Sequence, residues 1–440
     1  DEYGVEVIGT PIDAIERGED RDIFKQTMAE LGIEMARSKV SHTVEEAVAI
    51  ADELGYPCVL RPAYTMGGTG GGLVYNVEEL RTVVARGLAA SPVTEVLVEE
   101  SVLGWEELEF EVVRDAKGQM ITVCTIENID PMGVHTGDSF CAAPMQTIDQ
   151  AVIDRLQEKS YRIVEAVKVI GGTNVQWAHD PETDRDIIIE INPRTSRSSA
   201  LASKATGFPI ALISSMLAGG LTLDEIPCGK YGTLDKYYPD GDYVVIKFAR
   251  WAFEKFKGVE DKLGTQMRAV GEVMSIGKTY KEAFQKAIRS LEKGRYGLGF
   301  AKDFNGKSKG ELLSMLVTPT SERQFIMYEA LRAGATVDEL FELTKIKRYF
   351  IEQMAELVAE EEEIRSWSSA HPLQLLPDDM LVQAKKDGFA DKYLALLIGV
   401  PEKKIRAQRI GIGCTEAWEG VHVSSTQDSA YYYSTYNAPD

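Results

Sequence analysis

The alternation of apolar and polar residues changes in character near residue 310. Before that point, helical periodicity covers residues 12–32 and 44–54, and a glycine, Gly32 or Gly55, marks the end of each stretch. Short apolar runs predict strands at 58–60, 96–98, 108–113, 120–126, 174–178 and 187–191. Because hairpin turns separate several of these strands, the pattern predicts an α+β fold with antiparallel pairs rather than a regular βαβ sheet.

Beyond residue 310 the pattern is helical with little strand between the helices. Helices are predicted at 312–316, 324–331, 337–343, 348–363 and 377–385. We therefore expect a second domain that is all-α. Its run of four glutamates at 360–363 is interpreted as a solvated helix face, because acidic runs usually are.

Length, composition and net charge indicate a globular protein and argue against nucleic-acid binding. A chain of 440 residues can form two or three domains, and its 44% hydrophobic and 27% charged residues are ordinary for a globular protein. The formal net charge of −21 argues against a nucleic-acid-binding protein, which would show a basic face. An acidic protein can still bind an anion where local arginines or backbone N–H groups reverse the field, so we expect few functional arginines, placed in motifs.

Cysteine usage and hydropathy indicate the compartment. The five cysteines are scattered without a CxxC pair, which favours reduced thiols in a cytoplasmic protein. No apolar run approaches the roughly 20 residues that a membrane helix needs, and no secretory signal precedes the first predicted elements. The chain starts at Asp1 without a methionine and continues into a strand-like run at 5–9, so we interpret it as a fragment of a larger protein.

The predicted strand 187–192 carries the first candidate for chemistry. Alternate residues of a strand face opposite sides, so Ile188, Glu190 and Asn192 are expected to share one face. The isoleucines at 187, 189 and 191 would fill the other face. Glu190 and Asn192 would then present two oxygen-bearing side chains about 7 Å apart.

The preceding strand adds a third oxygen ligand. A hairpin centred on Thr183 would place Gln176 opposite Glu190, so Gln176, Glu190 and Asn192 would converge on one surface. Oxygen-only ligands with little charge suit Mg²⁺ that is shared with substrate phosphates. The alternative, a half-exposed hairpin with ordinary polar residues on its outer face, stays open from geometry alone.

Two arginines follow this strand, and a glycine-rich segment lies earlier in the chain. Arg194 and Arg197 could neutralise a transferring phosphoryl group or hold a small anion, although surface arginines are the common alternative. The segment 66–72 could cover phosphates with its backbone N–H groups, with Arg61 just before it, but a flexible hairpin is the common explanation. It is not a Walker A loop, because no Lys-Ser/Thr follows. His135, between glycines, is by default a structural histidine.

Three long runs resemble one family. They are Arg61-Pro-Ala-Tyr-Thr-Met-Gly-Gly-Thr-Gly-Gly-Gly72, the segment from Cys124 to Ser139, and the segment from Glu190 to Gly207 that opens Glu-Ile-Asn-Pro-Arg-Thr-Ser-Arg. These runs are similar to the carbamoyl-phosphate synthase large subunit. The resemblance points to its amino-terminal half, an ATP-grasp module that phosphorylates bicarbonate to carboxyphosphate, which ammonia then converts to carbamate.

The resemblance implies roles for residues that match the family's motifs. Arg21 and Arg61 would contact nucleotide phosphates, with Gly67 and Gly68 lying over them. Glu100 and Val102 would meet the adenine, Glu107 the ribose, and Gly133, Val134 and His135 would line the nucleotide pocket. Gln176, Glu190 and Asn192 would hold Mg²⁺ or Mn²⁺, with Gln176 and Glu190 also near ATP. Arg194 would hold bicarbonate or carboxyphosphate and act with Glu190 and Asn192 in catalysis.

The resemblance also implies an architecture and partners. Residues 1–20 would be a remnant of a preceding domain, 21–291 an ATP-grasp carboxyphosphate domain and 292–440 a helical oligomerisation domain. The implied partners are ammonia, a glutaminase small subunit, the second half of the large subunit and further copies of this chain, with no nucleic acid and no membrane. Two other interpretations stay open, namely a biotin carboxylase-like enzyme and a catalytically idle assembly piece.

Overall fold

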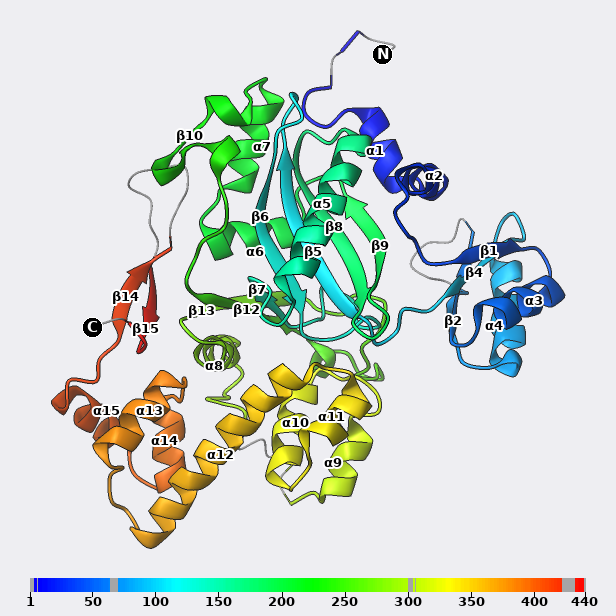
Figure 1. Ribbon diagram of the computed structural model, residues 1–440. Helices are drawn as coiled ribbons and strands as arrows, with labels where there is room; N and C mark the ends of the chain where they lie inside the picture. The colour runs from blue at the N-terminus through cyan, green and yellow to red at the C-terminus, as the bar shows by residue number, and fades with distance from the viewer. Residues whose placement is uncertain are drawn as a thin grey trace.

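A seven-stranded sheet forms the centre of the computed structural model, which describes residues 4–5, 7–63, 70–299, 304, 306–421 and 432–438 (Figure 1). Its strands are β5 (Glu106–Arg114), β6 (Met120–Asn128), β7 (Cys141–Ala143), β8 (Gly171–Asp180), β9 (Arg185–Asn192), β12 (Val244–Arg250) and β13 (Gly271–Gly277). Their order is β13-β12-β7-β6-β5-β8-β9, and every neighbouring pair is antiparallel. The predicted antiparallel α+β fold is confirmed.

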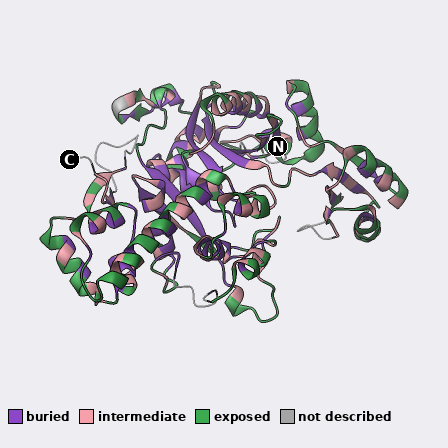
Figure 2. Ribbon diagram, turned by 60° about the horizontal axis from the view of Figure 1, so that its bottom comes forward, coloured by how far each residue is buried: buried purple, intermediate pink, exposed green. Residues whose placement is uncertain are grey.

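Helices cover both faces of this sheet, so its strands are largely buried (Figure 2). On one face, α5 (Gln150–Val167), α1 (Ile12–Glu19) and α2 (Arg21–Leu31) share a core with Phe110, Trp177 and Ile188. On the other face, α6 (Arg197–Thr206) and α7 (Ile210–Ala218) pack on Cys124 and Ile126. The sequence analysis did not predict α5, although it contains 18 residues.

A smaller four-stranded sheet forms a separate lobe beside the large one (Figure 1). Its order is β1-β4-β2-β3, and its elements are β1 (Ser38–Ser41), β2 (Cys58–Pro62), β3 (Gly72–Val74), β4 (Val96–Glu100), α3 (Val44–Leu54) and α4 (Val77–Ala90). The lobe has its own apolar core, which includes Leu60, Leu80 and Val98.

The helix ends follow from local side chains. Asp20 caps α2 by accepting from the N–H groups of Asp22 and Ile23, and this cap divides the predicted helix 12–32 into α1 and α2. Gly32 ends α2 with a left-handed φ of 66°. The predicted helix 44–54 is confirmed residue for residue as α3, with Thr43 as its cap.

The hairpin of β8 and β9 contains a β-bulge that moves one side chain to the other face. Gln176 pairs with Glu190 as predicted, but Trp177 pairs with Ile188, so Ile189 is the extra residue on β9. Ile188 and Ile191 therefore both lie in the core under α5. The prediction that Ile188 shares a face with Glu190 is wrong, because the bulge breaks the two-residue period.

The second region is mostly helical, as predicted, although it also contains one hairpin. Its helices are α8 (Tyr280–Ser290), α9 (Lys309–Met315), α10 (Arg323–Arg332), α11 (Val337–Thr344), α12 (Arg348–Ala370), α13 (Asp378–Lys386), α14 (Asp391–Ile398) and α15 (Glu402–Gly411). The hairpin of β14 (Ala417–Gly420) and β15 (Tyr432–Thr435) packs against β13. Between α7 and β12 in the sequence, β10 (Pro227–Cys228) and β11 (Gly232–Thr233) form a short antiparallel pair.

The glutamate run at 360–363 is not a uniformly solvated face. Glu361 is 0% exposed, and its carboxylate accepts hydrogen bonds from the hydroxyls of Tyr328 and Tyr393 and from Arg365. Burial also raises the pKa of the half-buried Glu360 to about 8. The interpretation from charge alone is wrong for these two residues, because α12 crosses the helical region with one face inside the core.

All five cysteines are free, and all but the half-buried Cys414 are buried. Within the part of the chain that the structure describes, no single helix is long and apolar enough to cross a membrane. The helices α6 and α7 pass that test only as a pair, and they are bent by 112° at their junction.

We predict that Trp177→Ala lowers the free energy of unfolding by about 3–5 kcal/mol, because a large buried side chain is lost. Trp177 is 0% exposed, and its indole N–H donates to Ser160 at 2.9 Å. Trp418→Ala is the matched control, because Trp418 is 66% exposed. Chemical denaturation of both variants tests the prediction, and equal losses would contradict it.

Candidate functional site

The three predicted metal ligands lie on one face of β8 and β9. Gln176 pairs with Glu190, and Asn174 with Asn192, so the bulge leaves this face intact. The amide Nδ2 of Asn192 donates to Glu190 Oε1 at 3.4 Å, and Gln176 Nε2 donates to Asn174 Oδ1 at 3.0 Å. The Gln176 nitrogen is thus held against Asn174, and its oxygen is available for another partner.

This donor set fits a small divalent cation. It contains one carboxylate and two amides, and Glu190 is exposed at the surface. Hard oxygen ligands with a single charge suit Mg²⁺ that also binds substrate phosphates. Within the described residues, no group of three or more His, Cys, Asp or Glu side chains is arranged to hold a metal. The set with Glu190 stays the predicted metal site.

Arg194 contacts this set, and Arg21 interacts electrostatically with Glu190 and with Arg61. Arg61 Nη2 lies 3.1 Å from Glu99 Oε1, and Arg194 Nη2 donates to Asn192 Oδ1 at 3.4 Å. Burial first, and then the charge of Arg61, lowers the pKa of Arg21, while Glu99 and Glu190 oppose the shift. Two guanidinium groups close enough to repel each other create a positive field, which favours a polyanion such as a triphosphate.

Two predicted site residues fall in a segment without a described structure. Gly67 and Gly68 belong to residues 64–69, which lie outside the described part of the chain. The segment starts just after Arg61, at the end of β2, and ends just before β3. The role of Gly67 and Gly68 over the phosphates stays a prediction.

A row of buried glutamates runs along β5, on the same face of the sheet as the oxygen set. Glu107, Glu109 and Glu111 alternate with Leu108 and Phe110, which face the opposite core. Glu109 and Glu111 were not predicted as site residues. The alternation of acids with apolar residues along this strand was the signal in the sequence that could have found them. Polar side chains satisfy Glu109, which accepts from Asn128 at 2.8 Å, from Asn174 at 2.9 Å and from Ser198 at 3.1 Å.

Glu107 differs from its neighbours because one of its oxygens has no partner. Its Oε2 atom is buried and lacks a hydrogen bond among the described residues. Burial, and then the charge of Glu109, raises the pKa of Glu107 well above its ordinary value. A ligand hydroxyl would supply the missing hydrogen bond. The predicted contact of Glu107 with a ribose agrees with this observation.

The carboxylate of Glu100 is already occupied by protein groups. It accepts from Arg37 Nη2 at 2.7 Å and from Arg185 Nη2 at 3.0 Å, which connects the small lobe to β9. Burial alone would raise the pKa of Glu100, but these hydrogen bonds hold it below its ordinary value. A contact of Glu100 with adenine would therefore use its main chain. Val102, two residues on, is half-buried.

The predicted pocket loop around Gly133 contacts the segment after β4. Met132 donates its N–H to Trp105 O at 2.8 Å, and Gly104 donates to Met132 O at 3.0 Å. Gly133 has a φ of 118°, and a Cβ there would come within 2.4 Å of Leu103 Cδ1. The positive φ favours glycine at this position, and any larger residue would displace the Leu103 side chain. The structure thus brings Gly133 and Val102 to neighbouring segments.

His135 is held in one tautomer. Its Nδ1 accepts from the Gly137 N–H at 2.9 Å, so the neutral ring carries its hydrogen on Nε2. Burial lowers the pKa of His135, which favours this neutral form. Lys247, on β12, donates to Thr136 O at 2.7 Å and fixes the loop against the sheet. Val134, the residue before His135, is buried in the core.

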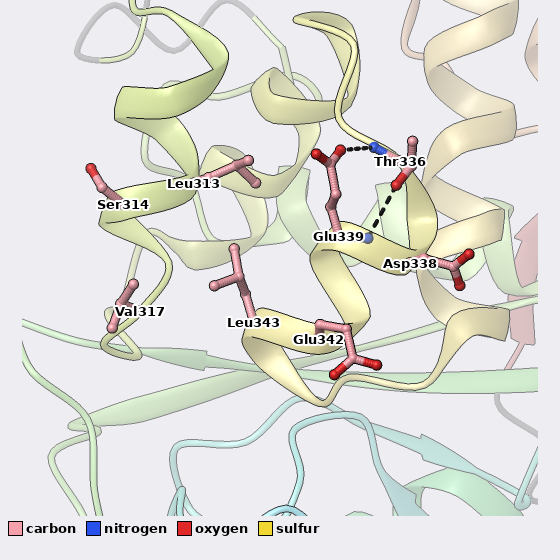
Figure 3. Close-up of a pocket in the computed structure, with 8 residues that line it drawn as sticks. All are labelled: Leu313, Ser314, Val317, Thr336, Asp338, Glu339, Glu342 and Leu343. Carbon is pink, nitrogen blue, oxygen red and sulfur yellow. Dashed lines mark hydrogen bonds between the residues drawn. The ribbon is translucent and has the colours of Figure 1, made fainter.

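The structure also has a depression of about 570 Å³ between α9 and α11, which contains no predicted site residue (Figure 3). It is lined by Leu313, Ser314, Val317, Thr336, Asp338, Glu339, Glu342 and Leu343. Leu313 and Leu343 point toward each other across it, while the carboxylate of Glu339 accepts from the Thr336 N–H (Figure 3). This groove lies on the helical region and is separate from the oxygen site on β8 and β9.

Two protein families match the chain in sequence. Residues 20–226 match the carbamoyl-phosphate synthase L chain, ATP binding domain, and residues 272–413 match the carbamoyl-phosphate synthetase large chain, oligomerisation domain. The chain belongs to the carbamoyl-phosphate synthase large-chain family. The second match includes β13 and α8, and the predicted domain boundary at 291/292 stays a prediction.

Curated relatives agree with this assignment. The chain is 46% identical to the carbamoyl phosphate synthase large chain of Archaeoglobus fulgidus over 441 residues, covering 99% of this chain and 41% of that one. It is 44% identical to the large chain of Pseudomonas aeruginosa, with 99% and 41% covered. The chain thus spans about two fifths of the length of these relatives.

Solved structures with similar folds include a biotin carboxylase from Campylobacter jejuni in a β,γ-ATP complex. Its TM-score is 0.52 at 14% identity, with 78% of this chain and 77% of that chain covered. The biotin carboxylase domain of Hydrogenobacter thermophilus 2-oxoglutarate carboxylase, in complex with MgADP, ADP and bicarbonate, gives a TM-score of 0.52 at 15% identity, covering 80% and 78%. At these identities the likeness shows the fold alone, and it confirms the predicted ATP-grasp class.

We predict that Glu111→Gln changes how stability depends on pH. Burial raises the pKa of Glu111 from 4.5 to about 8, and its oxygens accept from Asn174 at 2.8 Å and from Ser199 at 3.0 Å. The raised pKa stabilises the folded state below pH 4.5, and this contribution is lost as the pH rises toward 8, because the unfolded chain ionises first. Glutamine stays neutral and mimics the protonated acid.

The free energy of unfolding of the wild type should therefore fall relative to Glu111→Gln between pH 5 and pH 8, by on the order of a few kcal/mol. Denaturation curves at several pH values measure the difference. Glu182→Gln, in the exposed turn between β8 and β9, should give a difference that does not change with pH. Parallel curves for wild type and Glu111→Gln would show that Glu111 titrates normally.

Proposed function

We propose that this chain binds Mg·ATP and phosphorylates bicarbonate to carboxyphosphate, as part of a carbamoyl-phosphate synthase. The observation that carries the proposal is the oxygen set of Gln176, Glu190 and Asn192 with arginines around it. A site with one carboxylate has too little charge to hold a divalent cation tightly by itself, so it suits a cation that arrives with phosphates.

Different residues would bind the metal ion and the triphosphate of ATP. Gln176, Glu190 and Asn192 would hold Mg²⁺ or Mn²⁺, which neutralises phosphate charge when bound. Arg21 and Arg61 would attract the triphosphate, since their guanidinium groups lie close together despite their mutual repulsion. These interactions act on charge that is spread over the phosphoryl oxygens during transfer.

Arg194 is the proposed anchor for bicarbonate. It follows the end of β9 at Asn192, and among the described residues its exposed guanidinium has weak contacts at 3.4 Å to Asn192 Oδ1 and 4.0 Å to Glu19 Oε1. A planar guanidinium can bind a carboxylate-like anion through two parallel hydrogen bonds. In this position, a bicarbonate oxygen would attack the γ-phosphorus, the bond to the β-phosphate oxygen would break, and ADP would leave.

The nucleoside would lie between the segment after β4 and the loop at 133–135. The main chain of Glu100 and Val102 would bind adenine, and the unpartnered oxygen of Glu107 would accept from a ribose hydroxyl. His135, neutral and fixed through Gly137, would form the wall of the pocket. The His135 ring and the segments that carry Val102 and Gly133 are already held by protein hydrogen bonds, so little ordering of these parts would accompany binding.

The later chemistry and the partners are also proposals. Ammonia would displace phosphate from carboxyphosphate to give carbamate, and a glutaminase small subunit would supply the ammonia. A second large-chain half would phosphorylate carbamate. The match of residues 272–413 to an oligomerisation domain supports self-association through the helical region.

Two other functions make different predictions. A biotin carboxylase-like enzyme would release ADP in response to biotin, and the likeness in fold to such enzymes does not separate the two activities. A catalytically idle assembly piece would give no heat when Mg·ATP is added in a calorimeter. ADP release by the wild type with and without biotin, and calorimetry with Mg·ATP, separate these two functions from the proposed one.

We predict that Glu190→Gln lowers bicarbonate-stimulated ATP hydrolysis by about 100-fold or more, because the only carboxylate of the metal set loses its charge. The measurement is ADP release with and without bicarbonate at saturating Mg²⁺. Glu182→Gln, in the turn of the same hairpin, is the matched control and should keep full activity. Full turnover in Glu190→Gln would refute the metal assignment.

We predict that Arg194→Lys raises the KM for bicarbonate about tenfold, with a smaller change in the KM for ATP, because lysine cannot make two parallel hydrogen bonds. Steady-state kinetics with each substrate varied in turn give both constants. Arg348→Lys, at an exposed ion pair of the helical region, should leave both unchanged. An equal rise in both constants would instead place Arg194 at the nucleotide.

A further inference from the structure

The loop at residues 130–138, here called the nucleotide loop, is closed at its base by Asp130. The Asp130 carboxylate accepts from the Phe140 N–H at 2.9 Å and from the Ser139 hydroxyl at 3.3 Å. Ile129 also donates its N–H to Phe140 O at 2.8 Å. These bonds join the two ends of the loop, so the position of Asp130 sets the position of the residues between them.

Arg323, the first residue of α10 in the helical region, binds this base from the other side. Its Nε donates to Asp130 Oδ1 at 2.6 Å, and its Nη2 donates to Asp130 Oδ2. Nη2 also lies 3.3 Å from Asp138 O, at the far end of the loop, and Nη1 donates to Thr320 O at 2.8 Å. The side chains of Arg323 and Asp130 are only 4% and 2% exposed.

Aromatic rings complete the surroundings of Arg323. Its guanidinium lies 5.2 Å from the ring centre of Phe140 and 5.7 Å from that of Trp251. The Trp251 indole N–H donates to Asp138 Oδ1 at 2.9 Å. A planar guanidinium can stack on rings and bind a carboxylate with two nitrogens at once, and lysine cannot do both.

We propose that Arg323 is a positioning residue for the ATP site: it holds the nucleotide loop in its binding shape and makes nucleotide affinity depend on the helical region. The inference rests on the proposed function, because it requires Gly133 and His135 to line the nucleotide pocket. Arg323 acts through Asp130 and Asp138 at the base of the loop. A shift of the loop by a fraction of an ångström would misplace groups that must meet the nucleotide.

The test compares Arg323→Lys with a matched ion pair elsewhere in the helical region. Arg409 and Asp391 form a similar buried pair at 3.0 Å, with side chains 10% and 9% exposed, and Arg409 also lies near a backbone carbonyl, Cys414 O. Arg409→Lys should therefore lower thermal stability to a similar degree without touching the nucleotide loop. Both variants are made in the full chain.

In calorimetric titrations, Arg323→Lys should raise the Kd of Mg·ATP about tenfold and the KM for ATP similarly, with kcat changed less than twofold. Arg409→Lys should leave the Kd and both kinetic constants at the wild-type values. Asp130→Asn should raise the Kd of Mg·ATP as much as Arg323→Lys does. The double variant should have the same Kd as either single variant, because both substitutions remove the same interaction. Amide exchange in residues 131–138 should be faster than in the wild type in Arg323→Lys and unchanged in Arg409→Lys.

An unchanged Kd in Arg323→Lys, or an equal rise in Arg409→Lys, would overturn the inference and leave the proposed function intact. If the wild type itself does not bind Mg·ATP, the proposed function fails. In that case, amide exchange of the loop without nucleotide still decides whether Arg323 orders it, and equal exchange in both variants would overturn that part.

Discussion

The whole candidate site depends on how β8 and β9 pair. Because Ile189 is an extra residue on β9, the strand can bury Ile188 and Ile191 under α5 and still present Glu190 and Asn192 on the opposite face. Without the bulge, a strict two-residue period would put Ile188 on the same face as Glu190. The bulge thus resolves a conflict between two requirements. The core needs Ile188 and Ile191 on one face, and the metal set needs Glu190 and Asn192 on the other.

The second constraint is the cost of burying the carboxylates of β5. Glu109 and Glu111 are satisfied by asparagine and serine side chains, and these partners come from β6, β8 and α6. These neutral side chains satisfy the hydrogen-bonding capacity of the buried acids. They do so without adding another charged group that would compete for phosphates. The arginines are kept instead at the surface of the site, where Arg194 remains exposed. Glu109 pairs with Gln176, so the buried acids of β5 share the face of the metal set, while Arg194 lies exposed after the end of β9.

Local sequence signals predicted what depends on local structure. Helical periodicity and a terminal glycine predicted α3, and the hairpin register predicted that Gln176 lies opposite Glu190. Features set by tertiary packing were beyond such signals. The bulge at Ile189 and the burial of Glu361 both follow from a neighbour that is distant in the sequence, α5 in one case and Tyr393 in the other. The roles of the site residues came from family resemblance, and they stay predictions.

The helical region and the main sheet share one apolar core, and this has a mechanical consequence. The cluster that contains Val134 and Phe140 of the loop region continues through Phe248 on β12 to Phe325 on α10. Phe140 and Phe248 have ring centres 3.7 Å apart, and Phe248 and Phe325 6.4 Å apart. Close-packed interiors transmit strain rather than absorb it. A displacement of α10, such as self-association of the helical region could cause, would therefore reach the nucleotide loop through packing as well as through Arg323.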